Sequence, residues 1–193
     1  MDKINDSKQS LLLHCCCAPC ASHVLGCLTP LYDCTVLFYN PNIEPREEYE
    51  KRKGEIEKLL VRNSLCNDVE ILDCSYDNDT FAQLVSKLRS EPEGGARCSV
   101  CYKLRLRETA KRAAEKFELF TTTLSVSPYK NAKLLNEIGD RLAKEYGTGY
   151  LCSDFKKEDG YKHSVELSKE YDLYRQNFCG CMSSNRASEN KIF

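Results

Sequence analysis

The sequence lacks the long apolar runs of membrane proteins. None of its 193 residues belongs to a stretch approaching the roughly 18 to 20 apolar residues that span a bilayer. Residues 1–10 are polar and charged, and only Leu11, Leu12 and Leu13 precede His14, which is too short for the core of a signal peptide. We therefore expect a cytoplasmic protein that has no membrane partner.

The chain also lacks an excess of charge of either sign. Its 28 basic and 29 acidic residues leave a net charge of −1, which argues against broad, sequence-blind binding of nucleic acid. A local basic patch remains compatible with this balance, and the run KLRLRETAKR (103–112) is a candidate. A hydrophobic content of 41% and a charged content of 30% are typical of a globular domain.

A glycine-rich phosphate loop is absent after the first predicted strand, where nucleotide-using enzymes of alternating strands and helices usually carry one. Cysteines occupy that position, in the segment HCCCAPC (14–20). The sequence therefore weighs against a reaction that depends on ATP or NAD.

Short apolar, β-rich segments alternate with charged helical segments along the chain. The predicted strands are 10–15, 35–40, 69–74, 119–126 and 149–154, and the predicted helices are 18–28, 46–63, 79–91 (capped by Asp79), 102–117, 131–147 and 164–178. Such alternation implies right-handed crossovers and a mostly parallel five-stranded sheet covered on both faces. The pattern predicts an α/β fold, a Rossmann-like three-layer α/β/α sandwich, without fixing the strand order. We expect one catalytic domain over 11–182, between polar tails at 1–10 and 183–193.

Cysteine is abundant, with 13 residues. An odd number in a protein expected in a reducing compartment favours metal ligation or redox chemistry over structural disulfides. Three groups stand out: Cys16, Cys17 and Cys20 after the first strand, Cys98 and Cys101 in a predicted glycine-rich loop, and Cys179 and Cys181 at the end of the last predicted helix. Because ligands of open parallel sheets bind outside the carboxyl ends of the strands, we expect these groups to converge at one rim.

Thiolates are soft ligands suited to zinc and to iron–sulfur clusters. Three groups supply more sulfur than one tetrahedral zinc requires, which favours a polynuclear cluster, two metal centres, or a metal beside redox-active cysteines. Two other functions stay open: a zinc-stabilised module that binds tRNA or protein, and a thiol–disulfide or sulfur-transfer enzyme that uses Cys179 and Cys181. The remaining cysteines are predicted to pack as small hydrophobes: Cys15, Cys27, Cys34, Cys66, Cys74 and Cys152. We expect His14 to be a hydrogen-bonded interior residue.

Six segments together resemble a known family. They are HCCCAPC, YNPNIEP (39–45) with EYEKR (48–52), RCSVCYKLRL (97–106), FTTTLSVSPYKN (120–131), SDFKKEDGY (153–161) and LYRQNFCGC (173–181). In this order, from Leu11 to Met182, they resemble the cobalamin-independent epoxyqueuosine reductases. The resemblance implies an oxidoreductase that reduces epoxyqueuosine to queuosine at the wobble position of a tRNA anticodon. It also implies a Rossmann-like fold of the nucleotide-hydrolase-like (HUP) type, a [4Fe-4S] cluster and an additional mononuclear iron.

The same resemblance implies the metal ligands. They would come from Cys16, Cys17, Cys98, Cys101, Cys179 and Cys181, with Cys20 as a candidate for the neighbouring iron. In the family the position of Cys20 can also be aspartate, another reasonable iron ligand. Neither the resemblance nor the spacing decides which sulfur binds which metal.

Other site residues are predicted from their places on the strand-end loops. Beside Cys20, the candidate proton donors are Tyr129, Lys130 and Asp154, with water as an alternative. The candidate contacts to base or phosphate are Tyr39, Asn40, Asn42, Arg105, Arg107 and Lys156. An anticodon-loop base can reach such a rim because it is splayed out at lower cost than a paired base. The sequence does not identify the electron donor.

Overall fold

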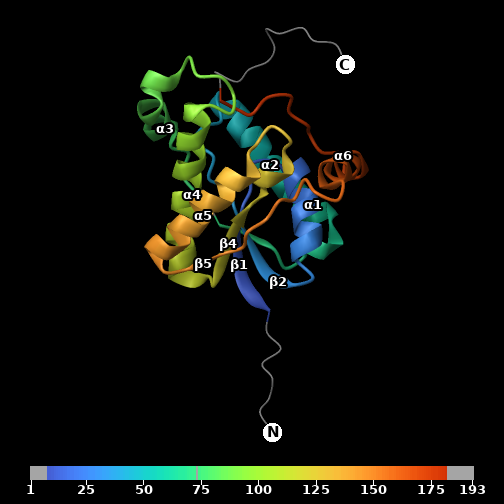
Figure 1. Cartoon of the computed structure of the whole chain (residues 1–193). Helices are drawn as coiled ribbons and strands as arrows, with labels where there is room; N and C mark the ends of the chain where they lie inside the picture. The colour runs from blue at the N-terminus through green and yellow to red at the C-terminus, as the bar shows by residue number, and fades with distance from the viewer. Residues whose placement is uncertain (1–7, 73, 182–193) are drawn as a thin grey trace.

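The computed structural model describes residues 8–72 and 74–181, and these contain one five-stranded sheet of order β3-β2-β1-β4-β5 (Figure 1). The strands are β1 (Gln9–His14), β2 (Tyr32–Leu37), β3 (Glu70–Leu72), β4 (Leu119–Thr122) and β5 (Gly149–Tyr150). Every pair of neighbouring strands is parallel. The predicted α/β class and the parallel five-stranded sheet are confirmed.

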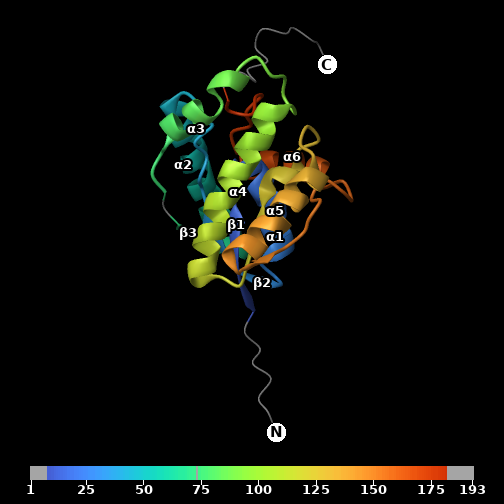
Figure 2. The same cartoon turned by 60° about the vertical axis from the view of Figure 1, so that its left-hand side comes forward.

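Helices cover both faces of the sheet. They are α1 (Ala18–Leu28), α2 (Arg46–Arg62), α3 (Asn78–Leu84), α4 (Ala96–Lys116), α5 (Ala132–Tyr146) and α6 (Gly160–Glu170). Leu11 and Leu13 of β1 pack into one core with α1 and α2, whereas Leu12 packs into a second core with α4 and α5. The alternation of side chains along a strand therefore produces the three layers seen in Figures 1 and 2. Helix α6 packs against the outside of α1.

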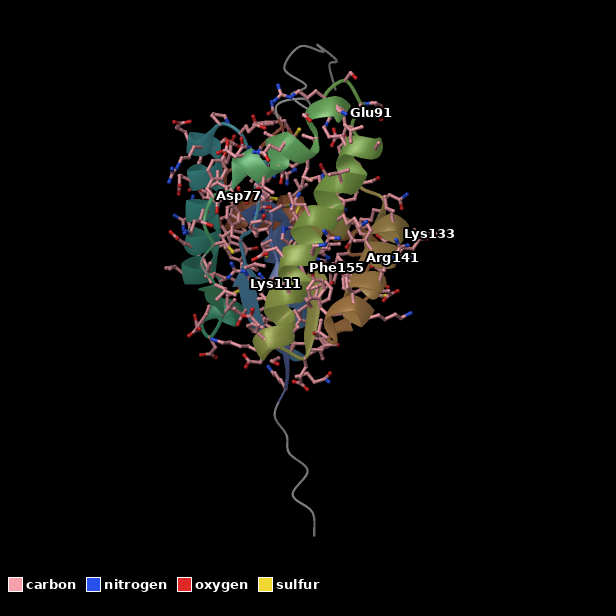
Figure 3. All side chains as sticks on the ribbon, turned by 90° about the vertical axis from the view of Figure 1, so that its left-hand side faces the viewer. Asp77, Glu91, Lys111, Lys133, Arg141 and Phe155 are labelled. Atoms are coloured by element: carbon pink, nitrogen blue, oxygen red, sulfur yellow. The ribbon has the colours of Figure 1, made fainter. Side chains whose placement is uncertain are left out.

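The outer faces of the helices carry the charge. Figure 3 shows the exposed side chains of Lys111 on α4 and of Lys133 and Arg141 on α5 pointing away from the sheet. Among the described residues, no helix is long and apolar enough to cross a membrane.

Several observed boundaries differ from the predicted ones because side chains cap the strand or helix at another residue. Strand β4 ends at Thr122, not at residue 126, because the Thr122 hydroxyl accepts a hydrogen bond from the Leu124 amide and starts a 3-10 turn, η3 (Thr123–Val126). Helix α3 is capped by Asp77, whose carboxylate accepts from the Thr80 amide, and not by Asp79. It ends at Leu84, so the predicted helix 79–91 is too long.

The predicted last helix, 164–178, was wrong over its second half. Helix α6 ends at Glu170, and the following segment runs along α2 without helical structure. Basic side chains of α2 take its carbonyl groups: Arg62 donates to the Tyr171 carbonyl at 2.6 Å, and Lys58 donates to that of Asp172. These bonds between segments compensate the carbonyls that a longer helix would have paired internally.

The first predicted tail is also too long by the structure, since residues 9 and 10 belong to β1. The remaining tail residues, 1–7 and 183–193, lie outside the described residues together with Met182, so the domain limits stay a prediction.

Candidate metal centre

The candidate site lies where the strand order reverses. The chain passes from β1 to β2 on one side, while β4 pairs with the other edge of β1. The carboxyl ends of two such strands diverge into a crevice, the usual ligand site of open α/β sheets. Here the loops after β1 and β4 line an open cavity of about 820 Å³, with Cys16, Cys17 and Cys20 on one wall and Tyr129 and Lys130 on another.

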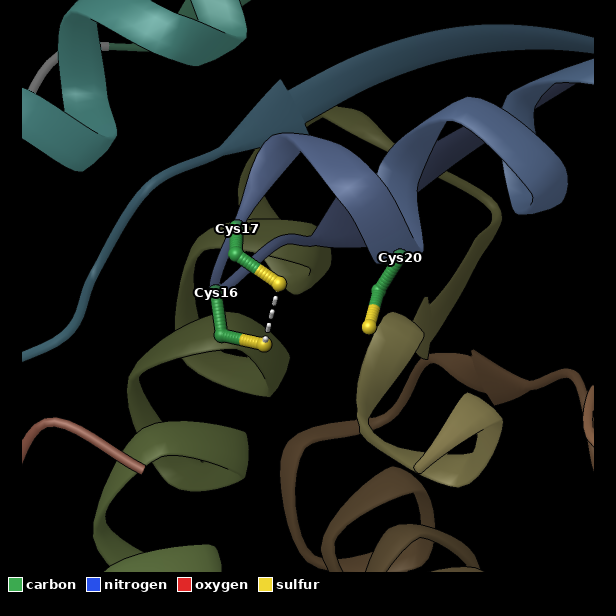
Figure 4. A group of neighbouring side chains, drawn as sticks. All are labelled: Cys16, Cys17 and Cys20. Carbon is green, nitrogen blue, oxygen red and sulfur yellow. Dashed lines mark hydrogen bonds between the residues drawn. The ribbon is translucent and has the colours of Figure 1, made fainter. Parts of the chain in front are cut away.

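Cys16, Cys17 and Cys20 form a three-thiol group at the start of α1. Their sulfur atoms all lie within 4.8 Å of one another, and those of Cys16 and Cys17 are 3.8 Å apart (Figure 4). Cys17 is the N-cap of the helix and Pro19 stands in its first turn, where the missing amide of proline costs no hydrogen bond. The helix start thereby directs three sulfurs to one point, as a metal site requires.

The three-thiol group is arranged to hold negative charge on Cys16. Hydrogen bonds with Cys17 and Cys20, aided by the cations Arg105 and Lys130, bring the pKa of Cys16 well below that of an ordinary thiol despite its burial. The hydrogen bond to Cys16 correspondingly raises the pKa of Cys17 to about 12, and the pKa of Cys20 also lies well above its usual range. Cys16 is therefore the most acidic of the three thiols.

A four-thiol group lines a second cavity of about 310 Å³. Its members are Cys98, Cys101, Cys179 and Cys181. The prediction that Cys98 and Cys101 lie in a loop was wrong, because α4 begins at Ala96 and includes both on its first turns. Their spacing of three residues puts them on the same side of the helix, near its N-terminus, and burial raises the pKa of Cys101 to about 11.

The two groups adjoin, because Cys179 lines both cavities. Sulfurs from three distant segments are therefore brought to one rim of the sheet, and the predicted convergence is confirmed. Seven thiols in two adjoining sets fit a polynuclear iron–sulfur group beside a further metal ion better than a single tetrahedral zinc.

The segment carrying Cys179 and Cys181 is held in place by Gly180 and Arg52. Gly180 has a φ of +105°, and a Cβ there would lie 2.9 Å from Cγ1 of Ile43. Its carbonyl accepts from the Glu44 amide at 2.9 Å. Arg52, only 2% exposed, donates to the carbonyl of Cys179 while its Nε pairs with Glu48 at 2.7 Å. Position 180 therefore requires glycine, which adopts a positive φ without strain and has no Cβ to contact Ile43.

We expect Gly180→Ala to lower the metal bound per chain, measured as iron, because the strained backbone and the contact with Ile43 would displace Cys179 and Cys181. Strain of this kind costs roughly 1–3 kcal/mol. Iron per chain and the free energy of unfolding would be measured beside Gly54→Ala, which lies inside α2 with open space around its Cβ. The control should bind iron normally, and normal iron in both variants would contradict the role given to Gly180.

Two cations, the buried Arg105 and the half-buried Lys130, face the thiols. Nζ of Lys130 lies 3.5 Å from Sγ of Cys179, and Nη1 of Arg105 lies 3.7 Å from Sγ of Cys101. Burial opposes both charges, yet the neighbouring thiolates raise the pKa of Lys130 and of Arg105 above their usual ranges. Both side chains stay protonated, and they offset part of the charge that gathered thiolates would carry.

Arg105 is the centre of a hydrogen-bond network beneath the site. It donates to Nε2 of His14 at 3.3 Å and to Oδ1 of Asn40 at 2.9 Å, and the Asn40 amide donates to the Cys15 carbonyl. Burial, followed by the charge of Arg105, lowers the pKa of His14 to about 3, so its ring is neutral. His14 is a hydrogen-bonded interior residue, as predicted. Arg105 and Asn40 are each 1% exposed, and Arg105 also lines the larger cavity, so their contact with substrate stays a prediction.

Comparison with known proteins agrees with this chemistry. A model of the family Epoxyqueuosine reductase QueH matches residues 11–187. The chain belongs to this family. The relatives named "Epoxyqueuosine reductase QueH" include proteins of Streptococcus pyogenes serotype M1 (43% identical, covering 91% of this chain and 70% of the relative), Staphylococcus epidermidis (38%, covering 91% and 76%) and Thermotoga maritima (36%, covering 91% and 90%).

The other predicted site residues of this QueH family member are spread more widely. Tyr129 and Lys130 line the larger cavity, and Asn42 lines the smaller one. Asp154 and Lys156 form an ion pair at 2.8 Å on the loop after β5. Among the described residues, those that line the two cavities do not include Asp154, Lys156, Tyr39 or Arg107.

The remaining cysteines follow the prediction in part. Cys15, Cys34 and Cys66 are buried, whereas Cys27 and Cys152 are exposed, so the prediction that these two pack inside was wrong. Cys27 stands on the outer side of α1, and Cys152 lies beyond the end of β5, where its thiol donates to Asp140 at 3.4 Å. Cys74 is half-buried.

Sequence reasoning missed two features of the site. The role of Arg52 as the anchor of the Cys179 segment was not assigned, although EYEKR was among the matching motifs. Residues 175–178 also line the larger cavity. The sequence analysis did not assign them to the site because it placed them in a helix, 164–178.

Proposed function

We propose that this protein is an epoxyqueuosine reductase that converts epoxyqueuosine to queuosine in the anticodon of a tRNA. The observation that carries the proposal is the gathering of seven thiols from three distant segments at the switch point of the sheet, in a chain of the QueH family. The donor set matches the redox chemistry that the family name describes.

The two thiol groups suggest how the metals would be divided. The four-thiol group would offer one thiolate to each iron of a [4Fe-4S] cluster, and the three-thiol group would offer ligands for one further iron. When bound, the cluster would supply single electrons and the further iron would act as a Lewis acid on the epoxide oxygen. Cys16, Cys17 and Cys20 would hold that iron.

The chain itself would bind the nucleoside and supply protons. The larger cavity opens to solvent, so a nucleoside would enter it from outside, and it carries polar side chains on the segment 175–178. Removing an epoxide oxygen requires two electrons and two protons. Tyr129, which is 59% exposed at the mouth, is the proposed proton donor, while Lys130 stays held against Cys179. Asp154 and water remain alternatives.

The tRNA would extend from the cavity over the surface. Lys103, Arg107 and Lys111 are exposed and recur every four residues on α4, which places them along one side of the helix. Such a row suits a phosphate backbone. Tyr39, Asn42 and Lys156 remain candidate contacts, and a separate electron donor is required.

The direct test is turnover by protein purified without oxygen. With a chemical reductant and tRNA that contains epoxyqueuosine, we expect queuosine to appear when the digested nucleosides are analysed by mass spectrometry. Iron and sulfide counts on the same sample should indicate about four to five iron atoms per chain. A colourless protein that contains only zinc and leaves the epoxide intact would instead support the zinc-stabilised module. Alkylation of Cys179 with equal ease in every metal state would support the sulfur-transfer enzyme.

A further inference from the structure

Aromatic side chains are exposed at the opening of the larger cavity. Tyr129 is 59% exposed and Tyr161 is 40% exposed, and both line this cavity. The other large hydrophobic side chains that are exposed in the described part of the chain are aliphatic and line neither cavity: Leu31, Val61, Leu65 and Leu84. Tyr129 follows η3, whereas Tyr161 belongs to α6, so two separate elements place an aromatic ring at one opening. Exposed apolar groups that gather in one place indicate a binding surface.

A cation lies at the same opening. Arg175 is exposed and lines the larger cavity, and its side chain makes no ion pair or hydrogen bond within the part of the chain that the structure describes. The other three cations of the lining are engaged. Arg52 pairs with a carboxylate of α2, while Arg105 and Lys130 face the thiols. Arg175 is therefore the cation of this lining that is available to an anionic ligand from outside.

Aromatic rings and a guanidinium are the groups with which proteins bind single-stranded RNA. Unpaired bases stack on tyrosine rings, and arginine binds phosphate or stacks on a base. A nucleoside that enters the cavity stays joined to its neighbours along the strand, so these neighbours must lie at the opening. Their bases would meet the exposed tyrosine rings, and a phosphate between them would meet the guanidinium.

We propose that Tyr161 and Arg175 bind the nucleotides that flank the reacting nucleotide in a single-stranded RNA loop. Tyr161 would stack on a flanking base, and Arg175 would pair with a phosphate. The inference rests on the proposed function, which brings an anticodon loop to this cavity. Tyr129 offers a ring for the other flanking base, but its hydroxyl is also the proposed proton donor. Tyr161 has no part in that chemistry, so its replacement separates binding from reaction.

An electron-donor protein is the other macromolecule that could cover this opening. The two tyrosines line a cavity that also contains thiols of the candidate metal centre. A ligand of these rings therefore reaches into the protein, as a splayed-out nucleotide does, whereas a folded donor protein would stay outside. The position of the rings favours RNA.

Binding of a hairpin RNA with an anticodon loop tests the proposal without turnover. RNA with an unmodified guanosine at the wobble position is titrated with protein purified without oxygen, and the affinity is measured by fluorescence anisotropy. Tyr161→Ala should weaken binding by about 5- to 150-fold, the range for loss of one base stacked on an aromatic ring. Tyr161→Phe should bind like the parent protein, because stacking needs the ring and not the hydroxyl. The side chain is 40% exposed, so both variants should fold.

Arg175→Gln should weaken binding through charge. The loss of one phosphate contact should lower the slope of log affinity against log salt concentration by about 0.7, the value for one phosphate of a single strand. Tyr161→Ala should leave this slope unchanged. Val61→Ala is the matched control, because its side chain is 85% exposed on α2 and lines neither cavity. It should bind the hairpin like the parent protein.

A fully paired duplex should bind more weakly than the hairpin, because paired bases cannot stack on a side chain. Equal affinity for duplex and hairpin, or an affinity unchanged in Tyr161→Ala, would overturn the proposal. If Tyr161→Ala kept its RNA affinity but slowed turnover only when reduced ferredoxin replaced the chemical reductant, the opening would bind a protein electron donor instead. The proposed function is tested separately, by queuosine formation in the parent protein, and would survive each of these results.

Discussion

Cys101→Ala is expected to remove the cluster iron and the turnover together. The Cys101 side chain is 6% exposed and lines the four-thiol cavity beside Cys98. Its replacement leaves three thiolates where four irons would need ligands, and it leaves Nη1 of Arg105 facing a void in place of Sγ at 3.7 Å. We expect iron and sulfide counts to fall by about four atoms each per chain and turnover to fall to background. Cys98→Ala should have the same effect.

Cys66→Ala provides the control for this prediction. Cys66 is 1% exposed but belongs to the apolar core around α2, so its loss tests for a general effect of removing a buried thiol. This variant should keep its iron and its turnover, with a modest loss of stability. Full iron content in Cys101→Ala would refute the assignment of the four-thiol group.

The sheet was predictable because its central strand, β1, contains a short apolar run that is buried on both faces. Leu11, Leu12 and Leu13 are all fully buried, and such a run between polar segments indicates a central parallel strand. The alternation with long amphipathic helices then determines the class. The strand order was not predictable, since the pairing of β1 with β4 joins residues about 108 positions apart and leaves no local pattern.

The thiol groups were predicted as a set, but not their local structure. The spacing of the cysteines indicates a metal whatever backbone carries them. That Cys98 and Cys101 begin a helix depends on Arg97, which is 1% exposed and donates to the Arg89 carbonyl at 3.0 Å. This contact fixes the turn before α4. Two glycines in a row, Gly94 and Gly95, are more typical of a loop, so a contact that the sequence pattern does not reveal decided the outcome.

Burial of single polar residues was the least predictable feature. Arg105 and Asn40 lie in matching motifs on the rim, which favoured contact with a ligand, yet they bond to each other and to His14 inside the protein. Cys27 occupies a helix of apolar character but faces outward next to His23. The partners of Arg105 and Asn40 lie on other elements of the fold. The direction of the Cys27 side chain depends on how α1 is rotated against its neighbours.

Cys20→Ala is expected to abolish turnover while sparing most of the iron. Cys20 belongs to the three-thiol group and is not among the lining residues described for the four-thiol cavity. Its loss removes one ligand of the proposed single iron and also a hydrogen bond that stabilises the Cys16 thiolate. We expect iron to fall by about one atom per chain with sulfide unchanged. Turnover should fall by about 1,000-fold or more, equivalent to roughly 4 kcal/mol in the barrier.

Cys20→Asp separates loss of the ligand from loss of packing. A carboxylate oxygen is also a ligand for iron, so this variant should regain the missing iron atom and part of the turnover, whereas Cys20→Ser should regain less. If Cys20→Ala lost all its iron and sulfide, the two thiol groups would be holding one metal assembly. If it kept full turnover, the three-thiol group would have no part in the reaction, and the chemistry would have to occur at the four-thiol group alone.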